Sequence, residues 1–182
     1  MRVISVNVGR PRTVQWHGEA VLTSIWKAPV ERAVRAAHDN LFGDEQSDLT
    51  VHGGPNKAVY AYPSEHYEFW RRELPDADLP WGAFGENLSI EGFLESDVAI
   101  GDRFRIGSAE LVVTQPRMPC YKLGIRFGDD RMVKRFMLSG RSGFYFSIAA
   151  AGEIRAGDAI ELLSRADDSR SIADVFKMRL KE

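Results

Sequence analysis

The single cysteine of this 182-residue sequence, Cys120, lies in a segment whose neighbours favour chemistry at its sulfur. Pro116 and Pro119 stiffen the chain before it, and a helix is expected to begin at Pro119. The partial positive charge at a helix amino terminus, together with Arg117 and Lys122, favours the thiolate. A thiolate is both a nucleophile and a ligand for soft metal ions. The alternative is that the cysteine is a small buried apolar residue.

A second candidate is the glycine-rich segment at residues 49–57. Gly53 and Gly54 allow close approach of a ligand to the backbone and expose amide donors, and His52 and Lys57 flank them. An anion is the expected occupant. The segment lacks the Gly-Lys-Ser/Thr ending of a Walker loop and the glycine spacing of a dinucleotide fold. The alternative is a glycine-rich hairpin turn.

A third candidate is the pair Glu86 and Asn87, which follows Gly85 in an irregular stretch rich in glycine and proline. A carboxylate beside an amide can hold a heterocycle that has both donor and acceptor edges. The alternative is an Asx-type turn with an exposed glutamate.

The same residues bear on two other classes of site. A structural zinc site needs three or four ligands at defined spacings, and one cysteine with scattered histidines gives no such pattern. The four histidines are His17, His38, His52 and His66. A cysteine hydrolase that uses Cys120 as nucleophile, His52 as base and Asn87 to orient it stays open as a minor alternative.

Length and composition favour one soluble globular domain. No apolar run reaches the roughly 20 residues that a transmembrane helix needs, and no secretory signal is evident, so no membrane association is expected and the cytoplasm is the expected location. The formal net charge is −2 and basic residues are dispersed. Nucleic acid as a polymer is therefore not an expected partner. A lone cysteine cannot form an internal disulfide, so its thiol is available for chemistry.

The elements that position these residues are expected to be mainly strands. Strands are predicted at 3–8 and 57–63, with 19–27 as the hairpin partner of the first. Ser64 is predicted to cap a helix that Pro75 ends. Strands at 110–115 and 143–149 flank helices at 119–126 and 130–138.

Two similar units, at 100–107 and 156–162, each place a Gly-Asp turn before a strand of alternating pattern. Paired turns of this kind indicate a small barrel. The apolar residues of the final segment, 167–182, are spaced as one face of a helix, which can dock on the barrel or on a partner.

Four motifs, in this order, resemble the MOSC domain, the family named after the carboxyl-terminal part of molybdenum cofactor sulfurase. The resemblance is closest to small stand-alone bacterial members and extends over about residues 25–163. The motifs are His52 to Tyr62, Phe84 to Leu88, Gly101-Asp102, and Gln115 to Cys120.

The resemblance implies a mainly β fold with a few helices: a β-barrel domain at residues 1–165 and a helical extension at 166–182, shorter than in longer relatives. It also implies a molybdenum-pterin cofactor with Cys120 as the metal ligand and catalytic residue; pyridoxal phosphate is not expected. The residues expected to hold this cofactor are Lys27, His52, Gly53, Gly54, Lys57, Glu86, Asn87 and Arg117.

The activity that the resemblance implies is the reduction of N-hydroxylated compounds such as 6-N-hydroxylaminopurine. Electrons would come from a separate flavoprotein reductase or electron carrier. The main alternative is a carrier that stores or delivers the cofactor or its sulfur without turnover.

Overall fold

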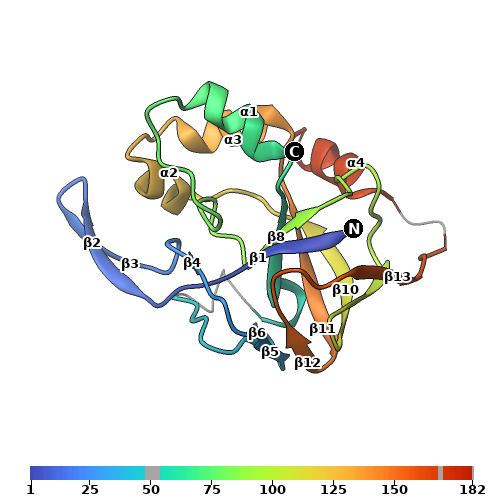
Figure 1. Ribbon diagram of the computed structural model, residues 1–182. Helices are drawn as coiled ribbons and strands as arrows, with labels where there is room; N and C mark the ends of the chain where they lie inside the picture. The colour runs from blue at the N-terminus through green and yellow to red at the C-terminus, as the bar shows by residue number, and fades with distance from the viewer. Residues whose placement is uncertain (48–53, 168–169, 182) are drawn as a thin grey trace.

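The computed structural model describes residues 1–47, 54–167 and 170–181, which form a mixed α+β fold made mostly of β-sheet (Figure 1). The helices are η1 (Pro55–Lys57), α1 (His66–Glu73), α2 (Tyr121–Phe127), α3 (Met132–Ser139) and α4 (Ile172–Arg179). The strands are β1 (Arg2–Val8), β2 (Arg12–Trp16), β3 (Glu19–Thr23), β4 (Ala28–Pro29), β5 (Val34–Ala37), β6 (Asn40–Leu41), β7 (Val59–Pro63), β8 (Leu88–Glu91), β9 (Arg103–Ile106), β10 (Ala109–Pro116), β11 (Phe144–Ala150), β12 (Gly152–Ile154) and β13 (Ile160–Ser164).

The main sheet has the strand order β13-β9-β10-β11-β7-β8-β1-β4, and within it only β7 and β8 run parallel among the described residues. A parallel pair needs a crossover, and α1 lies in the connection between these two strands. The expected Gly-Asp turns are present, and the strands that follow them, β9 and β13, pair with each other. Two smaller sheets, β12-β5-β6 and β2-β3, complete the described strands.

The expectation of a closed barrel is wrong, since no sheet in the described part of the chain closes on itself. The edge of β1 that does not pair with β8 contacts two different segments. Near its start, the Val3 amide donates to the Asp158 carbonyl at 2.9 Å, and a single bridge joins Arg2 to Ala159. Near its end, β1 pairs instead with β4. A continuous ladder between β1 and β13 therefore does not form.

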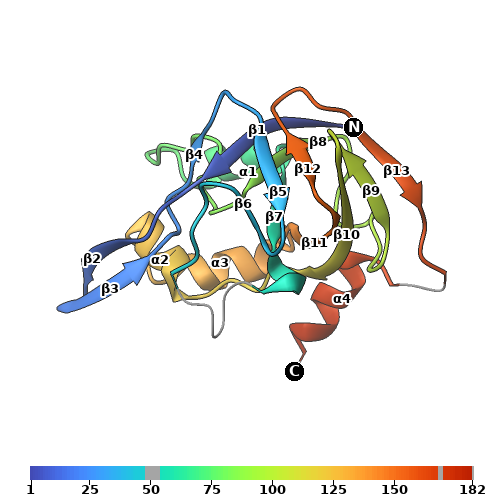
Figure 2. The same ribbon diagram turned by 90° about the horizontal axis from the view of Figure 1, so that it is seen from below.

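The hairpin predicted between residues 3–8 and 19–27 is also wrong. β3 pairs with β2, and the two-residue turn of His17 and Gly18 joins them. Both turn residues have positive φ, at 50° and 82°, the conformation that matches the twist of a tight hairpin. This hairpin projects from one end of the molecule beside α2 (Figures 1 and 2).

Two apolar clusters hold the fold together. One fills the space enclosed by the curved main sheet, with fully buried residues such as Leu111 and Phe146. The other is aromatic and lies between β7 and the helices α1 to α3. Here the rings of Trp70 and Phe136 stack at 5.9 Å, and Tyr62 contacts both neighbouring helices. Aromatic packing of this kind fixes α2 and α3 against the sheet.

The starts of α1 and α4 differ from expectation. α1 begins at His66 with Glu65 as its N-cap residue and no side-chain cap, so Ser64 does not cap it. α4 begins at Ile172, and the Ser171 hydroxyl accepts a hydrogen bond from the Asp174 amide at 3.1 Å. α4 packs against β10 through buried Ile172 and Phe176, so the final helix docks on the sheet.

None of the described helices is long and apolar enough to cross a bilayer.

Candidate functional site

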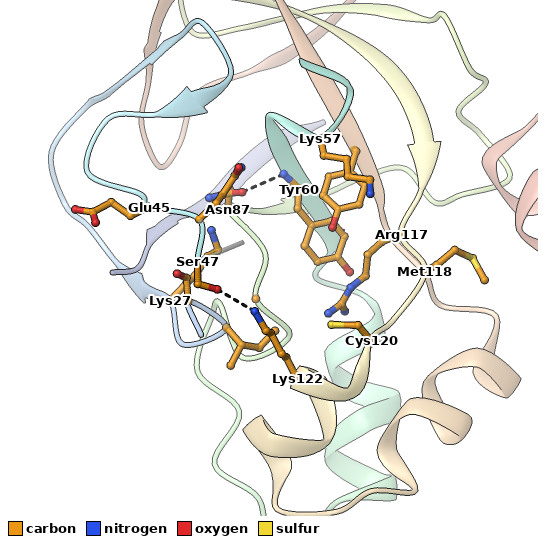
Figure 3. Close-up of a pocket in the computed structure, with 15 residues that line it drawn as sticks. Lys27, Glu45, Ser47, Lys57, Tyr60, Asn87, Arg117, Met118, Cys120 and Lys122 are labelled. Atoms are coloured by element: carbon orange, nitrogen blue, oxygen red, sulfur yellow. Dashed lines mark hydrogen bonds between the residues drawn. The ribbon is translucent and has the colours of Figure 1, made fainter. Parts of the chain in front are cut away.

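A pocket opens where the loop after β10 meets the start of α2, the loop before β4 and the segment after β6 (Figure 3). It encloses about 680 Å³ of empty space, including its open mouth. The lining residues are Ser24, Ile25, Lys27, Glu45, Gln46, Ser47, Lys57, Tyr60, Gly85, Asn87, Arg117, Met118, Cys120, Lys122 and Tyr145.

Cys120 is half-buried in this lining and occupies the N-cap position of α2. Its backbone is extended, with φ −119° and ψ 172°, and α2 begins one residue later, at Tyr121. The helix therefore starts two residues after the predicted position at Pro119. The extended segment between Pro116 and Cys120 lets the sulfur face the pocket before the chain turns into the helix (Figure 3).

Arg117 is the most buried cation of the pocket, with 4% of its surface exposed. Its guanidinium lies 5.0 Å from the ring centres of both Tyr60 and Phe136. Burial by itself would lower the pKa of Arg117, but the neighbouring Tyr60, Tyr145 and Cys120 outweigh burial and raise it. Its Nη1 atom is buried and has no hydrogen-bond partner among the described residues. The pocket thus contains a fixed positive charge with an unused donor.

Lys27 lies opposite Arg117 and forms a buried ion pair with Asp44. Burial lowers the pKa of Lys27, and Asp44 opposes that shift. Asp44 also accepts hydrogen bonds from the Gly9 amide at 2.8 Å and from Asn87 Nδ2 at 2.9 Å. Asn87 Oδ1 in turn accepts from the Tyr60 amide at 3.1 Å. One face of the pocket is therefore a connected and rigid polar network.

Glu86 is fully buried and lies outside the pocket lining, although the sequence places it beside Asn87. Its carboxylate accepts hydrogen bonds from the Tyr67 hydroxyl, from the amides of Gly82 and Phe84 at 2.8 and 3.1 Å, and from the Ser89 hydroxyl at 2.9 Å. These contacts hold the loop that carries Asn87. The structure therefore gives Glu86 a role in shaping the loop.

We predict that Glu86→Gln lowers the free energy of unfolding by about 1–3 kcal/mol, because an amide group then faces donors that need an acceptor. Activity per folded molecule should stay near wild type. Burial raises the pKa of Glu86, so its protonation stabilises the fold below the ordinary glutamate pKa, and this contribution is lost as pH rises through the folded value. The difference in unfolding free energy between wild type and variant should therefore be larger in mildly acidic buffer than at neutral pH. Thermal melts at the two pH values measure it. An unchanged melting temperature together with lost activity would indicate that Glu86 binds the cofactor and does not only shape the loop.

The glycine-rich candidate is only partly visible. His52 and Gly53 lie outside the described residues. His52 is also the base of the alternative cysteine hydrolase, so the structure does not test that alternative. Gly54 precedes η1 with φ 78° and does not line the pocket, whereas Lys57 at the end of η1 does. The carbonyl of Asn56 accepts a hydrogen bond from the Thr114 hydroxyl at 2.6 Å. This contact ties η1 to the strand that leads to Cys120.

Several lining residues lie outside the set that the sequence predicts to hold the cofactor. Lys122 is buried and donates to the Ser47 hydroxyl at 3.0 Å across the pocket (Figure 3). Tyr60 and Tyr145 form one aromatic wall, with ring centres 5.2 Å apart. Tyr60 on β7 pairs directly with Tyr145 on β11, and paired residues of neighbouring strands point to the same face of a sheet. Strand alternation could therefore have indicated that the two rings share a face. No local signal indicates that this face meets Cys120.

The donor set of the pocket fits a molybdenum-pterin cofactor. No group of three or more His, Cys, Asp or Glu side chains able to hold a metal occurs in the part of the chain that the structure describes. A soft metal that brings its own sulfur ligands needs only one thiolate from the protein, which Cys120 offers. Arg117 Nη1 and Ser24 Oγ are buried without partners among the described residues, and both line the pocket. They are free to bind the polar groups of such a molecule.

Fold and site together define a small α+β protein with a cationic pocket around one cysteine. The family model of the MOSC domain matches residues 48–161, and the chain belongs to this family.

YiiM of Escherichia coli is 41% identical over 157 residues, which cover 85% of this chain and 70% of that protein. The crystal structure of YiiM from Geobacillus stearothermophilus superimposes with a TM-score of 0.81 at 34% identity, over 98% of this chain and 83% of that one. A longer Gibberella moniliformis protein named "Reductase" is 35% identical over 179 residues, which are 97% of this chain and 32% of that protein. Family membership associates the chain with the molybdenum cofactor in general terms.

Proposed function

We propose that this protein is a molybdenum cofactor-dependent reductase of N-hydroxylated compounds such as 6-N-hydroxylaminopurine. The reaction takes up two electrons and two protons, breaks the N–O bond, and yields the amine and water. The observation that carries the proposal is the position of Cys120. Its sulfur faces a pocket that also contains a buried arginine donor with no partner among the described residues. Similarity to YiiM, and to a protein named as a reductase, supports the same assignment.

In this proposal the residues of the pocket divide into two roles. Cys120 is the metal ligand, and Arg117, Lys57 and the lysines around them bind the anionic and polar parts of the cofactor. Asn87 is fixed by Asp44 and the backbone of Tyr60, and so it presents a rigid edge to the pocket. When bound, the cofactor would supply a metal centre able to exchange an oxygen atom and two electrons.

The open mouth of the pocket supports a small substrate that enters after the cofactor is bound. Tyr60 and Tyr145 supply an aromatic wall on which a planar heterocycle can pack. The amide of Gln46, which also lines the pocket, can offer both a donor and an acceptor to the edge of such a ring. In this proposal a separate flavoprotein reductase or electron carrier supplies the electrons.

The direct test is reduction of 6-N-hydroxylaminopurine by the cofactor-loaded chain with a reduced viologen as artificial donor. We expect adenine to form with two electrons consumed per product. The same protein prepared without the cofactor should give no product. Tightly bound molybdenum without turnover on any N-hydroxylated compound would instead support the carrier alternative.

A further inference from the structure

We propose that Cys120 of the cofactor-free chain is a thiol–disulfide exchange site that selects anionic low-molecular-weight disulfides. The observations are the position of the half-buried Cys120 in the lining of an open pocket and the cations that line the same pocket. This inference does not depend on the reductase proposal. It concerns the protein before its cofactor is bound.

The charge around the sulfur is strongly one-sided. Four cationic side chains line the pocket, Lys27, Lys57, Arg117 and Lys122, against the single carboxylate of Glu45 among the described lining residues. Asp44 neutralises Lys27 from behind the lining. Glu45 points away from the cysteine, whereas the Arg117 guanidinium lies beside the sulfur (Figure 3). Clefts lined by one sign of charge concentrate ligands of the opposite sign.

Two buried donors give the pocket a specific demand for an anion. Arg117 is more than nine-tenths buried, and its Nη1 atom has no partner among the described residues. The Ser24 hydroxyl, which also lines the pocket, is buried without a partner in the same part of the chain. A buried donor without an acceptor is costly, so a ligand carboxylate placed there gains a charge-assisted hydrogen bond. A disulfide that carries carboxylates can satisfy such donors while its sulfur meets Cys120.

The exchange step is balanced without a further oxidant. The Cys120 thiolate attacks one sulfur of the disulfide, a new S–S bond forms to Cys120, and the other half leaves as a thiolate that takes up a proton from water. Cys120 is oxidised and the reagent disulfide is reduced. Excess thiol reverses the step. The adduct covers the sulfur and fills the pocket, so the cofactor-free chain would be protected from irreversible oxidation at Cys120.

The experiment measures adduct formation by mass spectrometry on the full chain made in a host that lacks the cofactor pathway. Glutathione disulfide is the anionic reagent and cystamine the cationic one. Because both meet the same thiol, the ratio of their rate constants cancels the thiolate fraction of Cys120. Dividing by the same ratio for 2-mercaptoethanol removes the difference in intrinsic reactivity between the two reagents.

We expect the corrected ratio to favour glutathione disulfide by at least about tenfold at low salt, and to approach one at high salt. Lys57→Gln and Arg117→Gln should each lower the ratio several-fold, whereas Arg126→Gln, an equal charge change outside the pocket lining, should not. Lys57→Gln keeps the test valid if Arg117→Gln fails to fold. A corrected ratio near one at low salt, or an unchanged ratio in both lining variants, would overturn the proposal.

Discussion

Replacing Cys120 by serine is expected to remove bound molybdenum and reductase turnover together, each to below about a tenth of wild type, because a hydroxyl is a poor ligand for a soft metal at neutral pH. The fold should be unaffected. Cys120 is half-buried and is the N-cap residue of α2, a position that serine favours. The free energy of unfolding of the cofactor-free chain should therefore change by less than about 1 kcal/mol.

These two measurements distinguish between Cys120 as a metal ligand and Cys120 as a buried apolar residue of the core. A serine placed in an apolar core would cost about 1–3 kcal/mol and leave the activity of the remaining folded molecules intact. Thermal melts of cofactor-free protein and turnover per folded molecule give the two numbers. Retained turnover with a lowered melting temperature would show that the sulfur is only a packing atom.

Replacing Arg117 by glutamine is expected to weaken cofactor retention at least tenfold while the chain still unfolds cooperatively. The buried guanidinium can give a bound anion a charge-assisted hydrogen bond that glutamine cannot replace, and truncating such a pair costs about 2–5 kcal/mol. Loss of the contacts with Tyr60 and Phe136 should cost the cofactor-free fold only about 1–2 kcal/mol. The variant also removes a buried donor that has no partner in the described part of the chain, which offsets part of that cost.

The quantity to measure is the rise in melting temperature when the cofactor is bound, in wild type, Arg117→Gln and Arg126→Gln. Stabilisation by a ligand falls as its affinity falls, so the rise should shrink in Arg117→Gln alone. Arg126 lies on α2 outside the pocket lining and controls for the lost positive charge. An equal rise in all three proteins would exclude Arg117 from the cofactor site.

Local patterns predicted the strands at β7, β10 and β11 and the helices near Cys120 to within a few residues. They succeeded because each of these segments is marked by residues that favour strands or by a periodic apolar pattern, with a proline or glycine near its boundary. The pairing of β1 was not predictable in the same way. Its partners β8 and β4 are chosen by long-range packing, while β3, the partner expected from the sequence, pairs with β2 through the tight turn at His17 and Gly18.

The site shows the same division. The family resemblance places Cys120, Arg117, Lys57, Lys27 and Asn87 in one site, and the structure brings these five into one pocket lining. Glu86 was assigned to the same site because it adjoins Asn87. Successive residues of an extended chain point to opposite sides, and here the carboxylate turns inward to Tyr67.

Asp44 carried no signal in the sequence. Its partners, Gly9, Lys27 and Asn87, are between 17 and 43 residues away along the chain. Only the folded sheet brings the carboxylate to them. Buried polar networks of this kind depend on tertiary structure, which local patterns do not encode.

The most direct test of the central claim is the molybdenum content of the wild-type chain and of Cys120→Ser, purified from one host with an intact cofactor pathway. A single cysteine ligand predicts about one molybdenum per wild-type chain and almost none in the variant at equal folded fraction. Equal molybdenum in the two proteins, or zinc or no metal in the wild type, would contradict the assignment of Cys120 as the ligand.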